Sequence, residues 1–269
     1  MALKIAVSGK GGVGKTTVAG ILARLYGREG KEVLVLDADP ASNLASAIGV
    51  PKEIREKIVP ISRMLDLIEE RTGVRPGSSY GGVFTINPKV DDITAKYAVE
   101  GKDGVKLLVL GTINKGGGGC FCPESALLKN LIRHLVLQKN QYLIMDMEAG
   151  LEHLGRASSR NMDVMLVVVE PGMRSLETAC KIKELANQII IQRIMAVLNK
   201  ASSRSEKDVV EETLKKSGLP LAATIPFNRM LIEADLKGIS PLDVEGTEDV
   251  VSAVQELKKE LEKERATSQ

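Results

Sequence analysis

The chain has 269 residues, a hydrophobic fraction of 43% and a formal net charge of +2 from 37 basic and 35 acidic side chains. These values are typical of one large globular domain with a substantial core. They exclude the strongly basic field of a DNA-coating protein, and the 3% of aromatic residues leaves little for a base-stacking platform.

The cysteine content and the N-terminal sequence both bear on the cellular compartment. The three cysteines are too few, and odd in number, for a disulfide framework, which favours a reducing compartment. The apolar run Leu3–Val7 is too short for the core of a signal peptide, and no stretch approaches the ~20 apolar residues that span a bilayer. We therefore expect a cytoplasmic protein.

Short apolar runs alternate with longer amphipathic patterns, and several runs are continuously apolar, as expected of strands buried on both faces of a parallel sheet. The predicted strands are Lys4–Ser8, Val33–Asp37, Lys106–Leu110, Tyr142–Met145, Val164–Val169, Ile194–Leu198 and Ala222–Ile225. The predicted helices are Thr16–Arg28, Ile61–Arg71, Glu124–Gln138, Leu176–Gln188, Glu206–Lys216, Arg229–Leu236 and Glu248–Lys263. This order predicts an α/β fold with a mostly parallel, doubly wound sheet flanked by helices.

The domain organisation is predicted to be simple. No shift in composition marks a second domain, so a single domain is expected over residues 1–269. Within the Gly-, Ser- and Asp-rich segment 75–104, we expect a short β-hairpin in which Thr94–Val99 pairs back onto Val105–Leu110.

A phosphate-binding loop follows the first predicted strand. Gly9, Gly14, Lys15 and Thr16 match the pattern G-x-x-x-x-G-K-[ST], with an apolar helix directly behind it. The glycines let backbone N–H groups surround phosphate oxygens, and the positive end of the helix faces the anion. Lys15 is expected to reach the β- and γ-phosphates and Thr16 to ligate Mg²⁺. The predicted nucleotide-binding residues here are Gly11, Gly12, Val13, Gly14, Lys15, Thr16 and Thr17.

Acidic residues end two of the predicted strands, at the edge where open α/β sheets bind their ligands. Asp37 and Asp39 end the second strand, and Asp146 follows Tyr142–Met145. An apolar strand that ends in Asp is typical of a Walker B site for Mg²⁺. Gly150 follows at a position from which its N–H can sense the γ-phosphate.

Two later strands end in residues that bear on the choice of base. Asn199 and Lys200 end one strand, and Pro226 and Asn228 lie at the end of the last. Ser202 stands where the guanine-specific pattern N-K-x-D requires Asp, so ATP is favoured over GTP.

A Cys-x-Cys element at residues 115–124 indicates a metal site. Cys120 and Cys122 are one residue apart, behind four glycines and before a predicted helix whose N-terminus favours a low thiolate pKa. A closed thiolate site needs four ligands, and a twofold axis would double the pair to four if the element lies at a dimer interface. Soft sulfur suits Zn²⁺ or Ni²⁺, and both stay open. Cys180, within a helical pattern, is interpreted as structural.

The early lysine of the phosphate loop, Lys10, points to a family. The string Gly-Lys-Gly-Gly-Val-Gly-Lys-Thr-Thr resembles the deviant Walker A ATPases, which include the Min and Par positioning ATPases and the nitrogenase iron protein. The resemblance implies that Lys10 crosses a homodimer interface to the partner's phosphates. It also implies that Lys10 and Lys15 act in catalysis together with Asp39, which orients or deprotonates the attacking water.

The same resemblance implies further roles. Asp37 would join Thr16 and Asp146 around Mg²⁺, Asn43 would hold the switch I loop, and Gly150 would be the switch II glycine. The adenine base would be framed by Asn199, Pro226 and Asn228.

Four strings together resemble a narrower group, the CooC-type accessory ATPases for nickel insertion into carbon monoxide dehydrogenase. They are the phosphate loop, Asp-Ala-Asp-Pro, Gly-Gly-Cys-Phe-Cys-Pro and Asp-Met-Glu-Ala-Gly-Leu-Glu-His-Leu-Gly-Arg. This resemblance implies a homodimer that binds ATP or ADP with Mg²⁺, and delivers Ni²⁺ to apo carbon monoxide dehydrogenase or a related nickel enzyme. It implies neither a nucleic acid nor a membrane as partner.

Two alternative functions stay open. A Min-type ATPase would end in a basic amphipathic helix, whereas the narrow apolar stripe of Glu248–Lys263 indicates a helix docked on its own domain. A Par-type ATPase would need a basic surface, which the net charge does not supply. Iron–sulfur assembly ATPases of this superfamily usually carry Cys-x-x-Cys, with two residues between the thiols rather than one.

Overall fold

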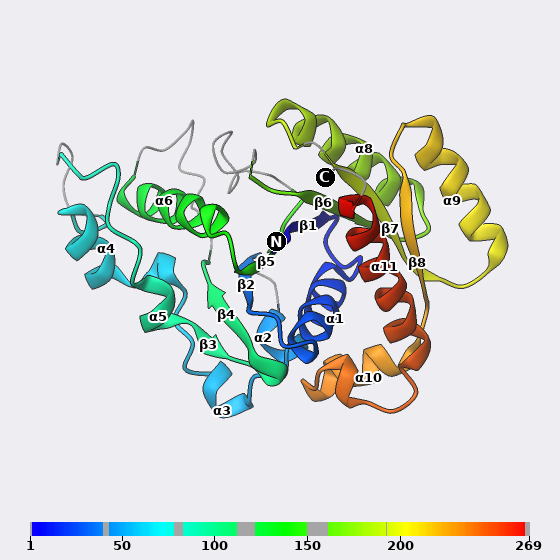
Figure 1. Ribbon diagram of the computed structural model, residues 1–269, viewed down its shortest axis with the longest axis horizontal. Helices are drawn as coiled ribbons and strands as arrows, with labels where there is room; N and C mark the ends of the chain where they lie inside the picture. The colour runs from blue at the N-terminus through cyan, green and yellow to red at the C-terminus, as the bar shows by residue number, and fades with distance from the viewer. Residues whose placement is uncertain are drawn as a thin grey trace.

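The computed structural model describes residues 2–39, 43–77, 83–111, 122–149, 161–191 and 193–266. Within these residues, eight strands form one sheet in the order β3-β4-β2-β5-β1-β6-β7-β8, which runs from left to right in Figure 1. The strands are β1 Lys4–Gly9, β2 Val33–Ala38, β3 Val99–Glu100, β4 Val105–Val109, β5 Tyr142–Met147, β6 Val164–Val169, β7 Ile194–Ala201 and β8 Leu221–Pro226. All neighbours pair in parallel except the edge strand β3.

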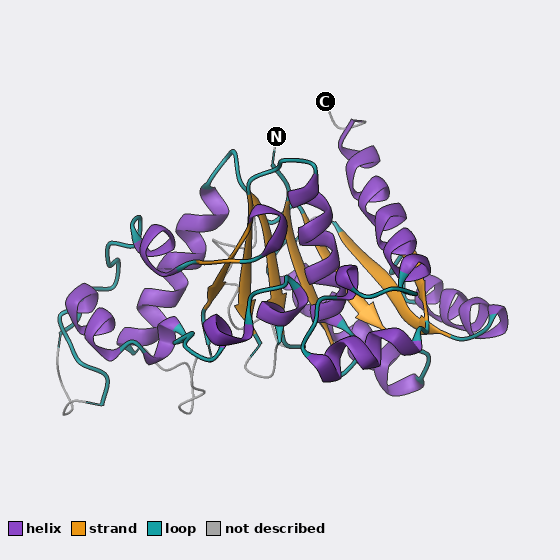
Figure 2. Ribbon diagram, turned by 90° about the horizontal axis from the view of Figure 1, so that it is seen from below, coloured by secondary structure: helices purple, strands orange, loops and turns teal. Residues whose placement is uncertain are grey.

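Helices cover both faces of the sheet (Figure 2). One face carries α4 Leu65–Thr72, α6 Pro123–Leu137, α8 Met173–Gln188 and α9 Arg204–Lys216. The other carries α1 Lys15–Arg28, α2 Leu44–Ala47 and α11 Glu248–Ala266. The remaining helices are α3 Lys52–Arg55, α5 Ile93–Tyr97, α10 Arg229–Lys237 and the 3₁₀ turns η1 Ile61–Arg63, η2 Lys102–Gly104 and η3 Pro241–Asp243.

The continuous apolar strands explain this layering. Successive side chains of a strand point to opposite faces, so an uninterrupted apolar run supplies two cores. In β2, Leu34 and Leu36 belong to one core and Val33 and Val35 to the other. The predicted fold class, a mostly parallel doubly wound α/β sheet, is confirmed.

The predicted hairpin is wrong over most of its length. Residues 94–97 belong to α5, and only Val99–Glu100 pairs antiparallel with β4. Ile93 and Tyr97 both pack against the core, and their spacing of four residues places them on one face of a helix. The predicted helix Ile61–Arg71 is divided at Met64, whose ψ of 76° separates η1 from α4.

The C-terminal helix docks on the sheet beside α1. Val250, Val254, Leu257 and Leu261 are fully buried in the core that α1 shares. Lys258 lies 5.0 Å from the centre of the Tyr26 ring on α1. The apolar stripe of α11 is therefore used within the domain, and none of the helices in the described ranges is both long and apolar enough to cross a membrane.

Candidate functional site

The phosphate loop connects β1 to α1 at the carboxyl edge of the sheet. Gly14 caps α1 with a φ of 95°, in the left-handed region that favours glycine. A Cβ at this position would lie 2.2 Å from Asn199 Nδ2, so no larger residue fits. The strand–loop–helix context that the sequence predicted is present, so the N-terminus of α1 points its backbone N–H groups and its positive dipole end at the loop, as in anion-binding helix starts.

Side chains at the end of β7 donate hydrogen bonds to backbone carbonyls of this loop. Asn199 donates from Nδ2 to the Val13 carbonyl at 2.8 Å, and Lys200 donates from Nζ to the Gly12 carbonyl at 2.6 Å. Lys200 also pairs with Glu170 at 3.0 Å. Since the C=O and the following N–H of a planar trans peptide point in opposite directions, these contacts turn the next amides towards the interior of the loop.

An ion pair joins the loop lysine to the acidic end of β2. Lys15 Nζ lies 3.2 Å from Asp39 Oδ2, and the two side chains are only 5% and 10% exposed. The Lys15 ammonium also lies 3.5 Å from the Lys10 carbonyl oxygen. The predicted catalytic groups Lys15 and Asp39 are thus in direct contact, so Lys15 already holds an anionic partner where phosphate is expected to bind.

The three predicted Mg²⁺ ligands converge beside this pair. Asp37 and Asp146 are register partners on the adjacent parallel strands β2 and β5, and their side chains are 6% and 0% exposed. Thr16 donates from Oγ1 to Asp146 Oδ2 at 2.6 Å. Two buried carboxylates and a hydroxyl form a set of hard oxygen donors, which fits Mg²⁺ shared with phosphate oxygens.

A cleft of about 800 Å³ opens over these groups. It runs from the phosphate loop to α10 and η3, and its lining includes switch I and the ends of β7 and β8. Among the predicted site residues, its walls contain Gly11, Gly12, Gly14, Lys15, Thr16, Thr17, Asp39, Asn43, Asn199, Pro226 and Asn228. Residues up to 217 positions apart in the chain, from Gly11 to Asn228, are brought together by the predicted topology.

Comparison with known proteins agrees with this geometry. The sequence profile of the CobQ/CobB/MinD/ParA nucleotide binding domain matches residues 4–242. The chain belongs to this family. It is 43% identical over 242 residues to the carbon monoxide dehydrogenase accessory protein CooC of Rhodospirillum rubrum, covering 90% of each chain. It is also 44% identical over 239 residues, or 88% of this chain and 90% of the relative, to an uncharacterised ATP-binding protein of Methanocaldococcus jannaschii.

Solved MinD structures share the fold. The Pyrococcus furiosus cell division ATPase MinD superposes with a TM-score of 0.67 at 23% identity, covering 98% of this chain and 99% of that one. MinD of Pyrococcus horikoshii, solved with Mg-ADP, gives a TM-score of 0.67 at 18% identity, covering 100% and 99%. The identity to CooC confirms the resemblance to CooC-type ATPases within the CobQ/CobB/MinD/ParA family.

The Cys-x-Cys element of this family member lies at the edge of the described residues. Cys120 and the switch glycine Gly150 fall outside them, and Cys122 is the residue before α6. Burial raises the pKa of the Cys122 thiol, and hydrogen bonds with Ser125 offset this only in part, so the expected low thiolate pKa is wrong for Cys122. Within the described ranges, no group of three or more His, Cys, Asp or Glu residues is arranged to hold a metal ion.

Asn228 lines the cleft and also has a structural role. Its Oδ1 accepts from the Met230 amide and its Nδ2 donates to Gly246 and Asp249, each at 2.7 to 2.8 Å. The side chain therefore caps α10 and shapes the base end of the cleft, while its own polar atoms are already engaged.

The sequence analysis missed Lys200 and Glu170 as site residues. The pair Asn199-Lys200 was interpreted only as evidence for the choice of base. The fact that Lys200 directly follows a buried strand could have indicated a contact with the phosphate loop. Lys200 also has a φ of 60°, which is uncommon for a residue other than glycine. Such a conformation persists where surrounding contacts fix it.

Replacing Lys200 by Met is expected to weaken Mg-ATP binding roughly tenfold, because the Gly12 carbonyl loses a charged donor and Glu170 loses its ion-pair partner. Titration calorimetry measures the change. Lys216→Met is the matched control, since Lys216 is 73% exposed and pairs only within α9. If Lys200→Met bound Mg-ATP with a dissociation constant within twofold of wild type, the contacts of Lys200 would not be what orders the phosphate loop.

Proposed function

We propose that this protein is a homodimeric ATPase that delivers Ni²⁺ to carbon monoxide dehydrogenase or a related nickel enzyme. The observation that carries the ATPase proposal is the convergence of Lys15, Thr16 and Asp39 in the wall of one cleft at the carboxyl edge of the sheet, with the buried Asp146 carboxylate hydrogen-bonded to Thr16. The identity to CooC over most of both chains supports the nickel assignment.

The residues divide the work of phosphoryl transfer, which depends chiefly on positioning and on neutralising charge. The loop amides and Lys15 hold the β- and γ-phosphates. Thr16, Asp37 and Asp146 hold Mg²⁺, which neutralises charge on the phosphate oxygens. Once phosphate has replaced Asp39 on Lys15, the Asp39 carboxylate accepts a hydrogen bond from the attacking water and removes its proton.

Lys10 and Gly150 complete the proposed site. Lys10 is half-buried in the phosphate loop, and its carbonyl accepts from the Val13 amide and the Lys15 ammonium. We propose that its own ammonium reaches the phosphates bound by a second chain. Gly150 would sense the γ-phosphate from the loop after β5. We assign ATP as the nucleotide because the guanine-specific Asp is absent after Lys200.

The metal site is proposed to form from Cys120 and Cys122 of two chains, four thiolates in all. β4, from which this segment continues, is paired with β2, and the Leu110 amide donates to the Asp37 carbonyl at 2.9 Å. The segment that leads to the cysteines therefore starts beside switch I. A change at Asp37 on nucleotide binding can pass through this hydrogen bond to Leu110, which precedes the cysteines in the same segment.

Activation of apo carbon monoxide dehydrogenase at limiting Ni²⁺ tests this function. Activity should rise when the protein and Mg-ATP are both present, and not when Mg-ADP replaces ATP. The function would be refuted by equal activation with and without the protein. A brown iron–sulfur chromophore on the anaerobically purified protein would favour the assembly ATPases instead.

A further inference from the structure

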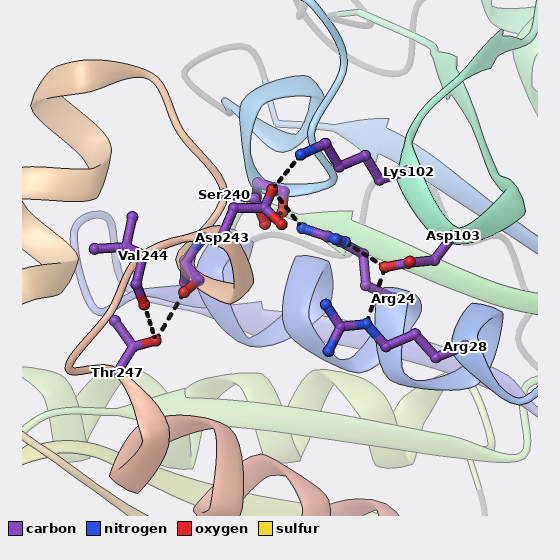
Figure 3. A network of polar contacts seen from close by, with 10 residues as sticks. Arg24, Arg28, Lys102, Asp103, Ser240, Asp243, Val244 and Thr247 are labelled. Carbon is purple, nitrogen blue, oxygen red and sulfur yellow. Dashed lines mark hydrogen bonds and ion pairs between the residues drawn. The ribbon is translucent and has the colours of Figure 1, made fainter.

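A buried arginine on α1, Arg24, lies at the centre of a network of polar contacts (Figure 3). Arg24 is 2% exposed and contacts two carboxylates, Asp103 Oδ2 at 2.7 Å through Nε and Asp243 Oδ2 at 2.8 Å through Nη1. Asp103 belongs to η2 and Asp243 to η3, so one guanidinium joins two segments 140 residues apart in the chain to the phosphate-loop helix. Lys102 adds a second cation at 3.1 Å from Asp243.

The Asp243 carboxylate of this network is held in the charged form. Burial alone would raise the pKa of Asp243, but hydrogen bonds from Arg24 and Lys102 outweigh it and keep the pKa below its usual value. A buried cation with two anionic partners fixes position strongly, because moving any one of them leaves an uncompensated charge.

Hydrogen bonds connect this network to residues that line the cleft. The Ser240 hydroxyl, 1% exposed and at the start of η3, donates to the carbonyl of Ala47 in α2. Thr247 Oγ1 donates to the carbonyl of Pro241 at 2.8 Å. Both acceptors, Ala47 and Pro241, line the cleft. Ala47 in α2 and Pro241 in η3 are therefore two points at which the network reaches the wall of the cleft.

The α2 wall also packs tightly against α1. A Cβ on Gly20 would lie 2.6 Å from the Ala47 Cβ, so only glycine allows this approach. The Lys102 amide donates to the Ile48 carbonyl at 2.9 Å, which holds α2 from the η2 side. Gly20 lies four residues past Thr16, about one turn along α1 from the phosphate-binding residues. We therefore expect α2 to lie beside the nucleoside of a bound nucleotide rather than beside its phosphates.

We infer that Arg24 is a positioning residue: through Asp243, Ser240 and Asp103 it sets the separation of α2 and η3 and so shapes the nucleoside end of the cleft. This inference rests on the proposed function, since it concerns ATP in the same cleft. The phosphate end is built on the loop, Lys15 and β7, and does not depend on this network.

Comparing Mg-ATP with Mg-tripolyphosphate, which has the phosphates and lacks the nucleoside, tests the inference by titration calorimetry. Arg24→Met, Asp243→Asn and Ser240→Ala should each weaken ATP binding roughly tenfold while tripolyphosphate stays within twofold of wild type. Ser240→Ala removes only one hydroxyl, so it provides the test if Arg24→Met does not fold. Arg28→Met is the matched control, because Arg28 shares Asp103, is 45% exposed and makes no contact with Asp243.

Equal weakening of both ligands, or no change in ATP binding with Ser240→Ala and Asp243→Asn, would overturn the positioning role. Failure of the wild-type protein to bind ATP would instead refute the proposed function. The two failures are therefore distinguishable in one set of titrations.

Discussion

The variant Asp39→Asn is expected to lose ATP turnover by at least ~100-fold, within the range that a general base contributes, while binding ATP more tightly than wild type. The Asp39 carboxylate lies 3.2 Å from Lys15 Nζ, and both side chains are largely buried. The γ-phosphate must displace this carboxylate from the ammonium before Asp39 can act on water. A neutral amide competes less for Lys15, so binding improves as chemistry is lost.

Single-turnover hydrolysis and titration calorimetry with Mg-ATP separate these two effects. Asp66→Asn is the control for loss of one carboxylate, because Asp66 is 92% exposed on α4 and far from the cleft in the fold. If Asp39→Asn turned over ATP at the wild-type rate, Asp39 would not be the base. If Asp39→Asn weakened ATP binding as well as turnover, the Lys15–Asp39 ion pair would stabilise the phosphate loop rather than compete with phosphate for Lys15.

The variant Cys122→Ser is expected to lose Ni²⁺ affinity by at least ~100-fold, which exceeds the cost of losing a hydrogen bond to a metal ligand. Each substitution removes two of the four thiolates from the proposed twofold site, and a closed thiolate site needs all four. Anaerobic equilibrium dialysis followed by elemental analysis measures the change.

Cys180→Ser is the matched control for Cys122→Ser. Cys180 is on α8 and donates from Sγ to Ser217 Oγ at 3.2 Å, so its replacement should leave Ni²⁺ binding unchanged. If Cys122→Ser still bound Ni²⁺, the Cys-x-Cys element would not be part of the metal site. If Cys180→Ser also lost Ni²⁺, the loss would not be specific to the Cys-x-Cys element.

The placement of Asp37 and Asp146 follows from one simple regularity. The carboxyl ends of parallel strands meet at the same edge of a sheet, so both residues were expected at that edge once their strands were recognised. They prove to be register partners. The phosphate loop was equally accessible, because its residues are contiguous and its function depends on local backbone geometry.

The parts that the sequence did not predict depend on contacts between distant residues. In the sequence, Arg24 is one of many charged residues in a predicted helix. Its partners Asp103 in η2 and Asp243 in η3 are 79 and 219 positions away, so only the fold shows that they are in contact. The short helices α2 and α3 have four residues each, too few for a helical period to show. For α5, the apolar positions that looked like a strand pack as one helical face against the core.

Native mass spectrometry of the anaerobic protein with Mg-ATP and Ni²⁺ counts chains, nucleotides and metal ions in one species, and so tests the proposed metal-bridged ATPase dimer. We expect a dimer that carries two ATP molecules and one Ni²⁺, and a metal-free species for Cys122→Ser. A monomer with bound ATP and no Ni²⁺, or a dimer whose Ni²⁺ survives Cys122→Ser, would contradict it.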